Sequence, residues 1–224
     1  MTQLLDRRAV RRLARNLDAG MGNEYFYGPF LSGAIAGRDD AAARLIMTVA
    51  LDDGVKPLTL EEIILQSHLF LGFPAMIETA RIFADVCDNH GRSDGLPGAY
   101  SEKDCRDWNR LGTAKIKRLY GPAFARLVRY INSFSPQILT WMINDGYGQV
   151  LSRPGASFQL RELSVVATLT VTGYENQLGA HIRGALNVGV GSSLIKKTMR
   201  NCRFFCPDDN IREAIHLLDQ AVTA

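Results

Sequence analysis

The segment that decides the fold is LRELSVVATLTVTGYENQLGAHIRGALNVG, residues 160–189. Its apolar residues recur at intervals of three and four on both sides of Gly173, which is the spacing of amphipathic helices. The β-branched run at residues 164–172 could also form a buried strand. It follows Arg161-Glu162, however, and lacks the polar alternation of a half-buried strand. We therefore predict two consecutive helices joined by a glycine turn, in an all-α protein.

The rest of the chain has the same helical spacing. Glycine or proline residues separate nearly all of its apolar stretches, as expected for helix boundaries. Helical spacing of apolar residues is clearest at residues 42–54, 59–73, 123–134 and 136–146. The exception is DNHGRSDGLPGAYSEKD, residues 88–104, whose composition is that of a linker.

Two segments on either side of this linker resemble each other. The residues that match in order, at a nearly constant offset, are Ala50-Leu51 with Ala185-Leu186, Gly54 with Gly189, Pro74 with Pro207 and Ala80 with Ala214. Several matches in one order indicate a duplicated helical unit. The predicted parts are an N-terminal helix, a first repeat, a linker and a second repeat, at residues 1–20, 21–87, 88–104 and 105–224. Ile46 takes the first-repeat position of His181, so an acid–base site would belong to the second repeat.

The composition is that of an ordinary globular chain. The 224 residues are 46% hydrophobic and 22% charged, and the net charge of +3 is too small to predict nucleic-acid binding. No apolar run approaches the roughly 18 residues that span a bilayer, so we predict no membrane segment. The N-terminal sequence DRRAVRRLAR has helical spacing, which indicates a helix packed on the body or a neighbouring subunit; binding to an anionic surface is the alternative.

The four cysteines lack the spacing of a disulfide framework, which favours a reducing, cytoplasmic setting. They are Cys87, Cys105, Cys202 and Cys206. Cys202 and Cys206 stand at positions i and i+4, so they could be a redox pair or two buried thiols. The sequence has no paired-cysteine zinc pattern and no His-x3-His pattern, so no structural metal is predicted.

His181 is the main candidate for chemistry. It lies on the apolar stripe of its predicted helix, for which Asn176 is a candidate N-cap. Glu162 lies early in the preceding helix, and contact between the two side chains requires the helices to cross or to be offset. A histidine beside a carboxylate in an apolar pocket is a general acid–base candidate. The alternative is a buried histidine that is hydrogen-bonded to a backbone carbonyl.

Other residues have two interpretations each. Arg153 could bind a substrate carboxylate or bond loop carbonyls. Tyr147 and Trp141 could wall a pocket for a flat ligand or pack in the core. Arg183 points to a different helix face from His181, which favours a salt bridge or a subunit contact. Glu61-Glu62 opens a helix after a threonine, which indicates N-terminal capping and compensation of the helix dipole.

Several motifs of the chain resemble the carboxymuconolactone decarboxylase family. They are Ser152-Arg153-Pro154-Gly155, Arg161-Glu162-Leu163, His181-Ile182-Arg183-Gly184-Ala185-Leu186, Gly189, and in the first repeat Gly72-Phe73-Pro74-Ala75. The resemblance implies an alkylhydroperoxidase D-like helical unit, present here in duplicate. That superfamily is all-helical and includes thiol peroxidases as well as lactone decarboxylases.

The resemblance also separates these two branches. In the peroxidase branch a Cys-x-x-Cys pair lies between a glutamate and a histidine, which match Glu162 and His181. The two cysteine positions are Tyr174 and Gln177 in this chain, and neither can form a thiolate. In the decarboxylase branch an acidic residue tends to precede the Ser-Arg-Pro-Gly motif, where this chain has Gln149. Decarboxylation would then take its negative charge from another carboxylate.

The resemblance implies a cofactor-free lyase of decarboxylase type, or a lactone-hydrolysing or isomerising enzyme. Its small-molecule substrate would be a carboxylated lactone or an aromatic-derived acid. His181 would donate or accept the proton, Glu162 would orient or charge it, and Arg153 would hold an anionic group. Alternatives are an alkylhydroperoxidase-like antioxidant protein of peroxiredoxin type and a non-catalytic oligomeric binding protein. Single-unit relatives form rings of paired subunits, so we expect a homo-oligomer, with a trimer favoured.

Overall fold

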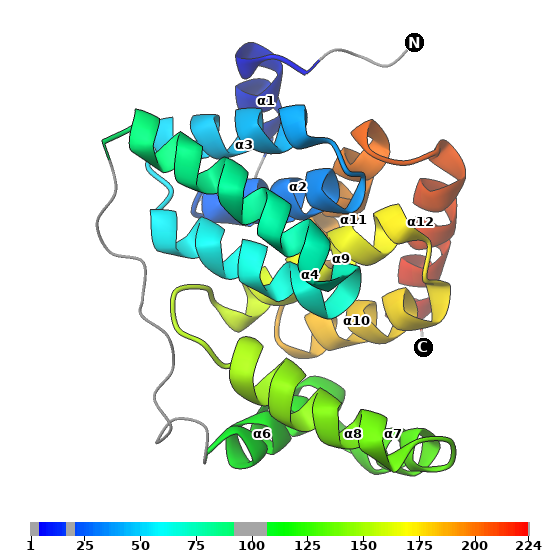
Figure 1. The fold of residues 1–224 in the computed structure, drawn as a ribbon. Coiled ribbons are helices and arrows are strands. Elements are labelled where there is room, and N and C mark those ends of the chain that lie inside the picture. The colour runs from blue at the N-terminus through cyan, green and yellow to red at the C-terminus, as the bar shows by residue number, and fades with distance from the viewer. Residues whose placement is uncertain (1–4, 17–20, 92–106, 224) are drawn as a thin grey trace.

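The computed structural model describes residues 5–16, 21–91 and 107–223. These residues form helices and connecting turns, with no strand among them (Figure 1). The helices are α1 (Arg7–Ala14), α2 (Glu24–Ala36), α3 (Asp40–Asp52), α4 (Pro57–Asn89), α6 (Trp108–Tyr120), η1 (Gly121–Ala123), α7 (Phe124–Asn132), α8 (Pro136–Trp141), η2 (Met142–Val150), α9 (Phe158–Thr172), α10 (Glu175–Asn187), α11 (Ser192–Asn201), η3 (Cys202–Phe204) and α12 (Asp208–Thr223). The predicted all-α fold is confirmed.

Two apolar helices, α2 and α9, pack against each other at the centre of the molecule. Buried residues run without a break from Phe26 to Ile35 in α2 and from Leu160 to Val171 in α9. A helix that is apolar all round needs cover on every side. Helices α3 and α4 cover α2, while α10, α11 and α12 cover α9. The β-branched run of the sequence is therefore a central helix rather than a strand.

Helices α3 and α10 end in the same kind of turn. Gly54 and Gly189 follow them with φ values of +86° and +92°, in the left-handed region that favours glycine. The residue after each glycine donates its N–H to a carbonyl of the helix at 2.9 Å, in the pairs Val55–Ala50 and Val190–Ala185. This likeness agrees with a duplicated unit, which stays a prediction.

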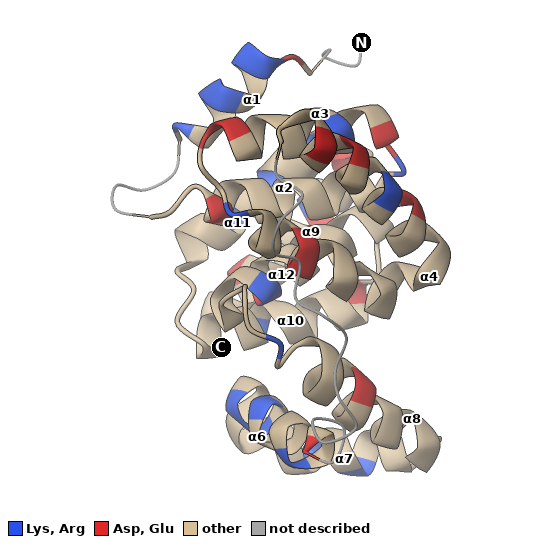
Figure 2. Cartoon of the chain, turned by 60° about the vertical axis from the view of Figure 1, so that its left-hand side comes forward, with Lys and Arg blue, Asp and Glu red and all other residues tan. Residues whose placement is uncertain are grey.

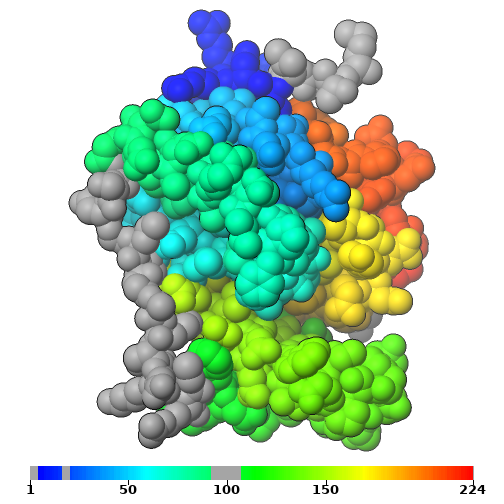
Figure 3. Space-filling view, in the orientation of Figure 1, coloured from blue at the N-terminus to red at the C-terminus, as the bar shows by residue number. Residues whose placement is uncertain are grey.

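The segment from α6 to η2 forms a layer against one end of the body, green at the bottom of Figures 1 and 3. Helix α6 contacts α10, and η2, which has π-helical hydrogen bonding, contacts α4. Gly112 of α6 and Gly148 of η2 lie where these two segments cross. A Cβ at Gly112 would overlap the backbone of Ile143, and one at Gly148 would overlap the backbone of Trp108. The two backbones therefore touch with no side chain between them.

Helix α1 packs on the body, as predicted, and lies beside α3 in Figure 2. Val10 of α1 is fully buried. Arg11 Nε donates to Asp53 Oδ1 at 2.9 Å, and Arg7 donates to Asp52 at 3.1 Å. Arg7 and Arg11 of this helix thus face acidic residues at the end of α3.

The predicted linker begins later than expected. Helix α4 continues to Asn89, so the first residues assigned to the linker are helical. The remainder of it, residues 92–104, and Cys105 lie outside the described residues. Within α4, Gly72 has a φ of +79° and interrupts the helix. Across the described residues, no helix combines the length and the apolar character that crossing a membrane requires.

Candidate active site

Glu162 of α9 and His181 of α10 meet in the interior. Nδ1 of His181 lies 2.9 Å from Oε2 of Glu162. The Glu162 side chain is 0% exposed and the His181 side chain 5%. A carboxylate accepts hydrogen bonds, so Nδ1–H donates to Glu162 and the tautomer is fixed. The other ring nitrogen, Nε2, is then the one that can exchange a proton with a reacting molecule.

The turn at Gly173 explains why the two side chains reach each other. Gly173 ends α9 with a φ of +72°, and α10 begins at Glu175. With a rise of about 1.5 Å per residue, Glu162 lies roughly 16 Å and His181 roughly 12 Å from this turn. The small offset is within the reach of a glutamate side chain. Asn176, the predicted N-cap, lies inside the first turn of α10, and Tyr174 precedes the helix instead.

Other helices complete the walls around the pair. Phe70 of α4 contacts the His181 ring edge-on, with centroids 5.7 Å apart and an interplanar angle of 82°. Gly184 of α10 lies beside the carboxylate, because a Cβ there would come 3.3 Å from Glu162 Oε2 and 2.7 Å from Leu119 Cδ1. The lack of a side chain at Gly184 therefore lets α10 pack closely against Leu119 and the Glu162 carboxylate.

Two tyrosine hydroxyls lie close enough to Glu162 for its charge to shift their pKa values. The hydroxyl of Tyr120, at the end of α6, is hydrogen-bonded to that of Tyr147 in η2. Burial, together with the charge of Glu162, raises the pKa of both groups, and the pKa of Tyr147 lies well above 10. Both phenols are thus neutral hydrogen-bonding groups at physiological pH. Lys115 of α6 is also near, and burial followed by the charge of Arg161 lowers its pKa.

One oxygen of the carboxylate has no partner. Among the described residues, nothing hydrogen-bonds to Oε1 of Glu162, although the atom is buried. Leaving a buried acceptor unpaired costs about 1–3 kcal/mol, and more for a charged group. Native proteins keep few such atoms, and those that they keep call for a functional or structural reason. Glu162 can therefore accept a further hydrogen bond through Oε1 while it binds His181 through Oε2.

A cavity of about 340 Å³ adjoins the pair and lies between α6, α7 and α10. We call it the α10 cavity. Its lining includes Tyr120, Arg126, Arg183 and Gly184. This volume is at the small end of the range for ligand pockets. Gly184 and Tyr120 belong both to the cavity wall and to the surroundings of Glu162, whereas Glu162 and His181 themselves do not line the cavity.

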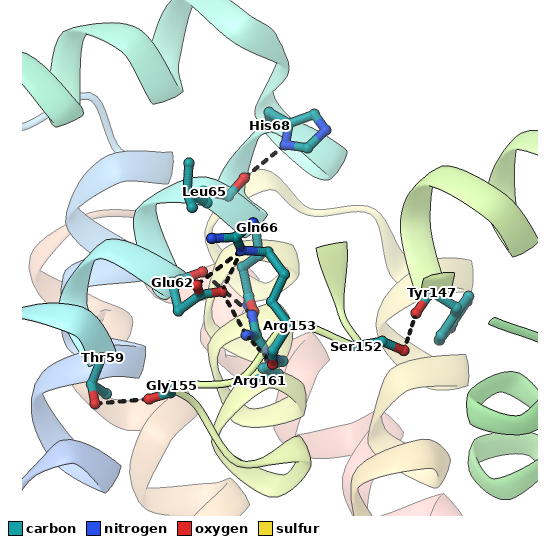
Figure 4. Close-up of polar contacts among 10 residues, drawn as sticks. All are labelled: Thr59, Glu62, Leu65, Gln66, His68, Tyr147, Ser152, Arg153, Gly155 and Arg161. Carbon is teal, nitrogen blue, oxygen red and sulfur yellow. Dashed lines mark hydrogen bonds and ion pairs between the residues drawn. The ribbon is translucent and has the colours of Figure 1, made fainter. Parts of the chain in front are cut away.

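Arg153 belongs to a different cluster (Figure 4). Its Nε donates to both oxygens of Glu62, at 2.9 and 3.1 Å. Arg161, which is fully buried, donates to Glu62 at 2.8 Å and to the Arg153 carbonyl at 3.0 Å. The predicted role of Arg153 in substrate binding is therefore not supported, because its guanidinium is bound to a carboxylate of the protein. Glu62 is likewise part of this cluster rather than only a helix-capping residue.

The two aromatic residues predicted to wall a pocket differ in their exposure to solvent. Tyr147 is 4% exposed and is linked through Tyr120 to the α10 cavity. Trp141 is 59% exposed at the end of α8, so within one chain it does not enclose a ligand. Gln149, the residue at the position of an expected acid, is half-buried in η2.

The sequence interpretation missed three residues of this site. Tyr120, Phe70 and Arg126 come from segments far from Glu162 and His181 in the chain and belong to none of the motifs. The only available signal was the run KIKRLY at residues 115–120, which combines basic residues with an aromatic one at the end of a helix. Such a run is more often an exposed helix face than a site, so it carried no prediction.

The described cysteines are poorly placed for redox chemistry. Cys202 is 2% exposed, and burial raises the pKa of its thiol well above 9. Burial and the charge of Asp208 raise the pKa of Cys206 to about 11. Both groups therefore stay thiols rather than thiolates near neutral pH. Within the described ranges, no group of three or more His, Cys, Asp or Glu side chains could hold a metal ion.

Comparison with known proteins concerns this same part of the chain. Residues 138–220 match the model of the carboxymuconolactone decarboxylase family. A curated relative, the 4-carboxymuconolactone decarboxylase of Acinetobacter baylyi (strain ATCC 33305 / BD413 / ADP1), is 26% identical over 95 residues, which are 42% of this chain and 71% of the relative. The matched segment contains α9 and α10 with both residues of the buried pair. Residues 138–220, and with them Glu162 and His181, are thus similar to the carboxymuconolactone decarboxylase family.

Proposed function

We propose that this protein is a cofactor-free lyase of decarboxylase type, in which His181 is the general acid–base residue. The observation that carries the proposal is the buried hydrogen bond of 2.9 Å between His181 Nδ1 and Glu162 Oε2. It leaves Nε2 for the substrate, and among the described residues no hydrogen bond to Nε2 occurs. The proposed substrate is a small carboxylated lactone or aromatic-derived acid, in keeping with the name of the curated relative.

The reaction needs an electron sink and a proton. When the carbon–carbon bond to the carboxylate breaks, CO₂ leaves and the electron pair stays on carbon, where a conjugated lactone carbonyl takes it up as an enolate. His181 in its imidazolium form then protonates that carbon through Nε2 and takes a replacement proton from solvent. Glu162 stabilises the imidazolium and holds the ring in place. Hydrolysis or isomerisation of a lactone would use the same two groups.

The test is the variant His181→Ala, assayed with 4-carboxymuconolactone and a panel of related lactones and aromatic acids. Loss of a general acid–base residue lowers kcat/KM about 10²- to 10⁴-fold. His216→Ala is the matched control, because His216 is exposed on α12 and, among the described residues, is hydrogen-bonded to Gln220 alone. Turnover by the His181→Ala protein at the wild-type rate, with the helical circular dichroism intact, would overturn the proposal.

Two observations argue against the alternatives. A peroxidase needs a reactive thiolate, whereas Cys202 and Cys206 have raised pKa values and the residues at the family's cysteine positions are Tyr174 and Gln177. A purely structural histidine would bond a backbone carbonyl, whereas His181 bonds a carboxylate. Mass spectrometry after peroxide treatment tests the first alternative: a sulfenate or a disulfide would revive it.

We further propose that copies of this chain assemble in the cytoplasm, with a trimer as the favoured form. Four large apolar residues on and between α7 and α8 support this: Tyr130, Phe134, Ile138 and Trp141 are each between 46% and 64% exposed. Apolar side chains gathered on one part of a surface are typical of interfaces. Light scattering coupled to size exclusion measures the assembly, and a monomer at micromolar concentration would contradict it.

A further inference from the structure

The α10 cavity has a wall charge that no acidic side chain of the described residues neutralises. Arg126 of α7 and Arg183 of α10 both line it. Neither forms an ion pair with a carboxylate among the described residues. The lining contains no Asp or Glu. By contrast Arg11, Arg153 and Arg161 are each held by an acidic side chain. The cavity therefore has a positively charged wall, and the two arginines that line it are exposed to solvent.

One wall of the cavity also borders the Glu162–His181 pair. Gly184 lines it, and a Cβ at this position would lie 3.3 Å from Oε2 of Glu162. Tyr120 lines it as well, and its pKa responds to the charges of Glu162 and Arg183. An anion held by the arginines would thus lie along the same wall as the Glu162–His181 pair. The volume of about 340 Å³ suits a small molecule and no polymer segment of any length.

The chemistry of decarboxylation decides which group the arginines can hold. The carboxylate that is lost becomes neutral CO₂, so a guanidinium bound to it would stabilise the reactant more than the transition state and slow the reaction. A guanidinium bound to a second carboxylate, which stays on the product, binds reactant and transition state alike. Guanidinium groups recognise carboxylates through paired, charge-assisted hydrogen bonds.

We propose that Arg183 and Arg126 form a carboxylate-binding subsite in the α10 cavity, which holds the carboxylate that the reaction retains. The substrate is then a small dicarboxylate, with one carboxylate on the arginines and the other near His181. The inference rests on the proposed function and replaces Arg153, which Glu62 occupies, with two other residues. It makes Arg183 and Arg126 determinants of specificity rather than catalytic residues.

The experiment measures binding instead of turnover. Isothermal titration with isophthalate, a small planar dicarboxylate, is compared with its neutral dimethyl ester for wild type and for the double variant Arg126→Gln/Arg183→Gln. The expected result is that wild type binds isophthalate more tightly than the ester, and that the double variant loses about tenfold or more of this affinity. Added salt should weaken binding to wild type and have less effect on the variant.

Arg129→Gln is the matched control, because Arg129 lies on α7 close to Arg126, is exposed and does not line the cavity. It should bind isophthalate like wild type. Isophthalate binding that the double variant retains in full, or wild type that binds no isophthalate at millimolar concentration, overturns the subsite. The His181→Ala protein should keep its affinity for isophthalate. Wild-type turnover by that protein would refute the proposed function alone, while full binding by the double variant would refute the subsite alone.

Discussion

Glu62 and Glu162 are two buried carboxylates with opposite surroundings. Each side chain is 0% exposed. Glu62 of α4 accepts hydrogen bonds from Arg161 of α9 at 2.8 Å and from Arg153, which precedes α9, at 2.9 and 3.1 Å. Glu162 accepts one hydrogen bond, from His181, and among the described residues its Oε1 has no partner. Both oxygens of Glu62 are thus hydrogen-bonded, whereas Glu162 has one oxygen that can still accept a hydrogen bond.

This difference indicates that Glu62 has a structural role and Glu162 a chemical one. A buried charge that is fully paired can hold two segments in register, but it has no lone pair left for a substrate. A buried charge with an unpaired oxygen costs stability, and it is retained where it acts on a neighbour or a ligand. The comparison predicts that the same substitution lowers mainly stability at Glu62 and mainly activity at Glu162.

The largest expected effect is on folding, from Glu62→Gln. This change leaves Arg161 and Arg153 without their carboxylate, and Arg161 is fully buried. Breaking a buried pair by removing one partner costs about 3–5 kcal/mol of unfolding free energy. Urea denaturation measures it. Glu78→Gln is the control, because Glu78 pairs with Arg81 on the surface and should lose less than about 1 kcal/mol. Equal small losses in both variants would remove the structural role of Glu62.

The next effect is on activity, from Glu162→Gln. The amide oxygen can still accept from His181 Nδ1, so the fold should keep its unfolding free energy within about 1 kcal/mol. Without the negative charge the imidazolium form is less stable, and kcat/KM should fall about 10²-fold. Steady-state kinetics and urea denaturation on one preparation give both numbers. A stability loss as large as that of Glu62→Gln, with activity unchanged, would show that the two carboxylates do the same work.

A third effect is a fall in the free energy of unfolding at alkaline pH. Several buried or half-buried groups have pKa values raised above their ordinary 9 to 10, namely Tyr27, Tyr120, Tyr147, Cys202 and Cys206. Above about pH 9 the unfolded chain releases these protons while the folded chain keeps them, so stability falls as pH rises. Lys115, whose pKa is lowered, acts in the opposite direction but is a single group.

The slope of unfolding free energy against pH, measured with reductant between about pH 8 and pH 10.5, should reach about 1.4 kcal/mol per pH unit for each group that titrates. Tyr147→Phe should flatten the slope, whereas Tyr130→Phe should not, because Tyr130 is 64% exposed. A stability that stays constant over this range would contradict the burial of these phenols and thiols.

The smallest effect is that of Tyr147→Phe at neutral pH. The variant loses the hydrogen bond between the hydroxyls of Tyr147 and Tyr120 but keeps the aromatic packing. A single neutral hydrogen bond contributes about 0.5–1.5 kcal/mol. The hydrogen bond from Ser152 to the Tyr147 carbonyl, at 2.7 Å, involves the backbone and should persist. Thermal unfolding measures the loss, and a variant as stable as wild type would show that this hydroxyl pair is energetically neutral.

The sequence was most informative where structure is local. The helical spacing of residues 160–189 predicts α9 and α10 nearly to the residue, because the period of apolar side chains and the turn at Gly173 act within a few residues. The burial of His181 follows from the same stripe. The contact between His181 and Glu162 depends on where two helices cross, which spacing alone leaves open.

Long-range partners were harder to find. Arg153 lies 91 residues from Glu62 and Arg161 lies 99 from it, so no local pattern links them. The interpretation of Glu62 as a helix-capping residue used its neighbours and missed its true partners. In the same way, Tyr120 and Arg126 enter the site only because α6 and α7 fold back against α10. Packing between distant segments, and not the propensity of any one of them, decides such positions.

The crossing of α6 and η2 at Gly112 and Gly148 has a mechanical consequence. With backbone resting on backbone, there is no flexible side chain at this point to absorb a displacement. Helix α6 carries Tyr120 at the wall of the α10 cavity, and η2 carries Tyr147. A displacement of α6 at Tyr120 is therefore expected to move η2, and with it Tyr147, in the same direction.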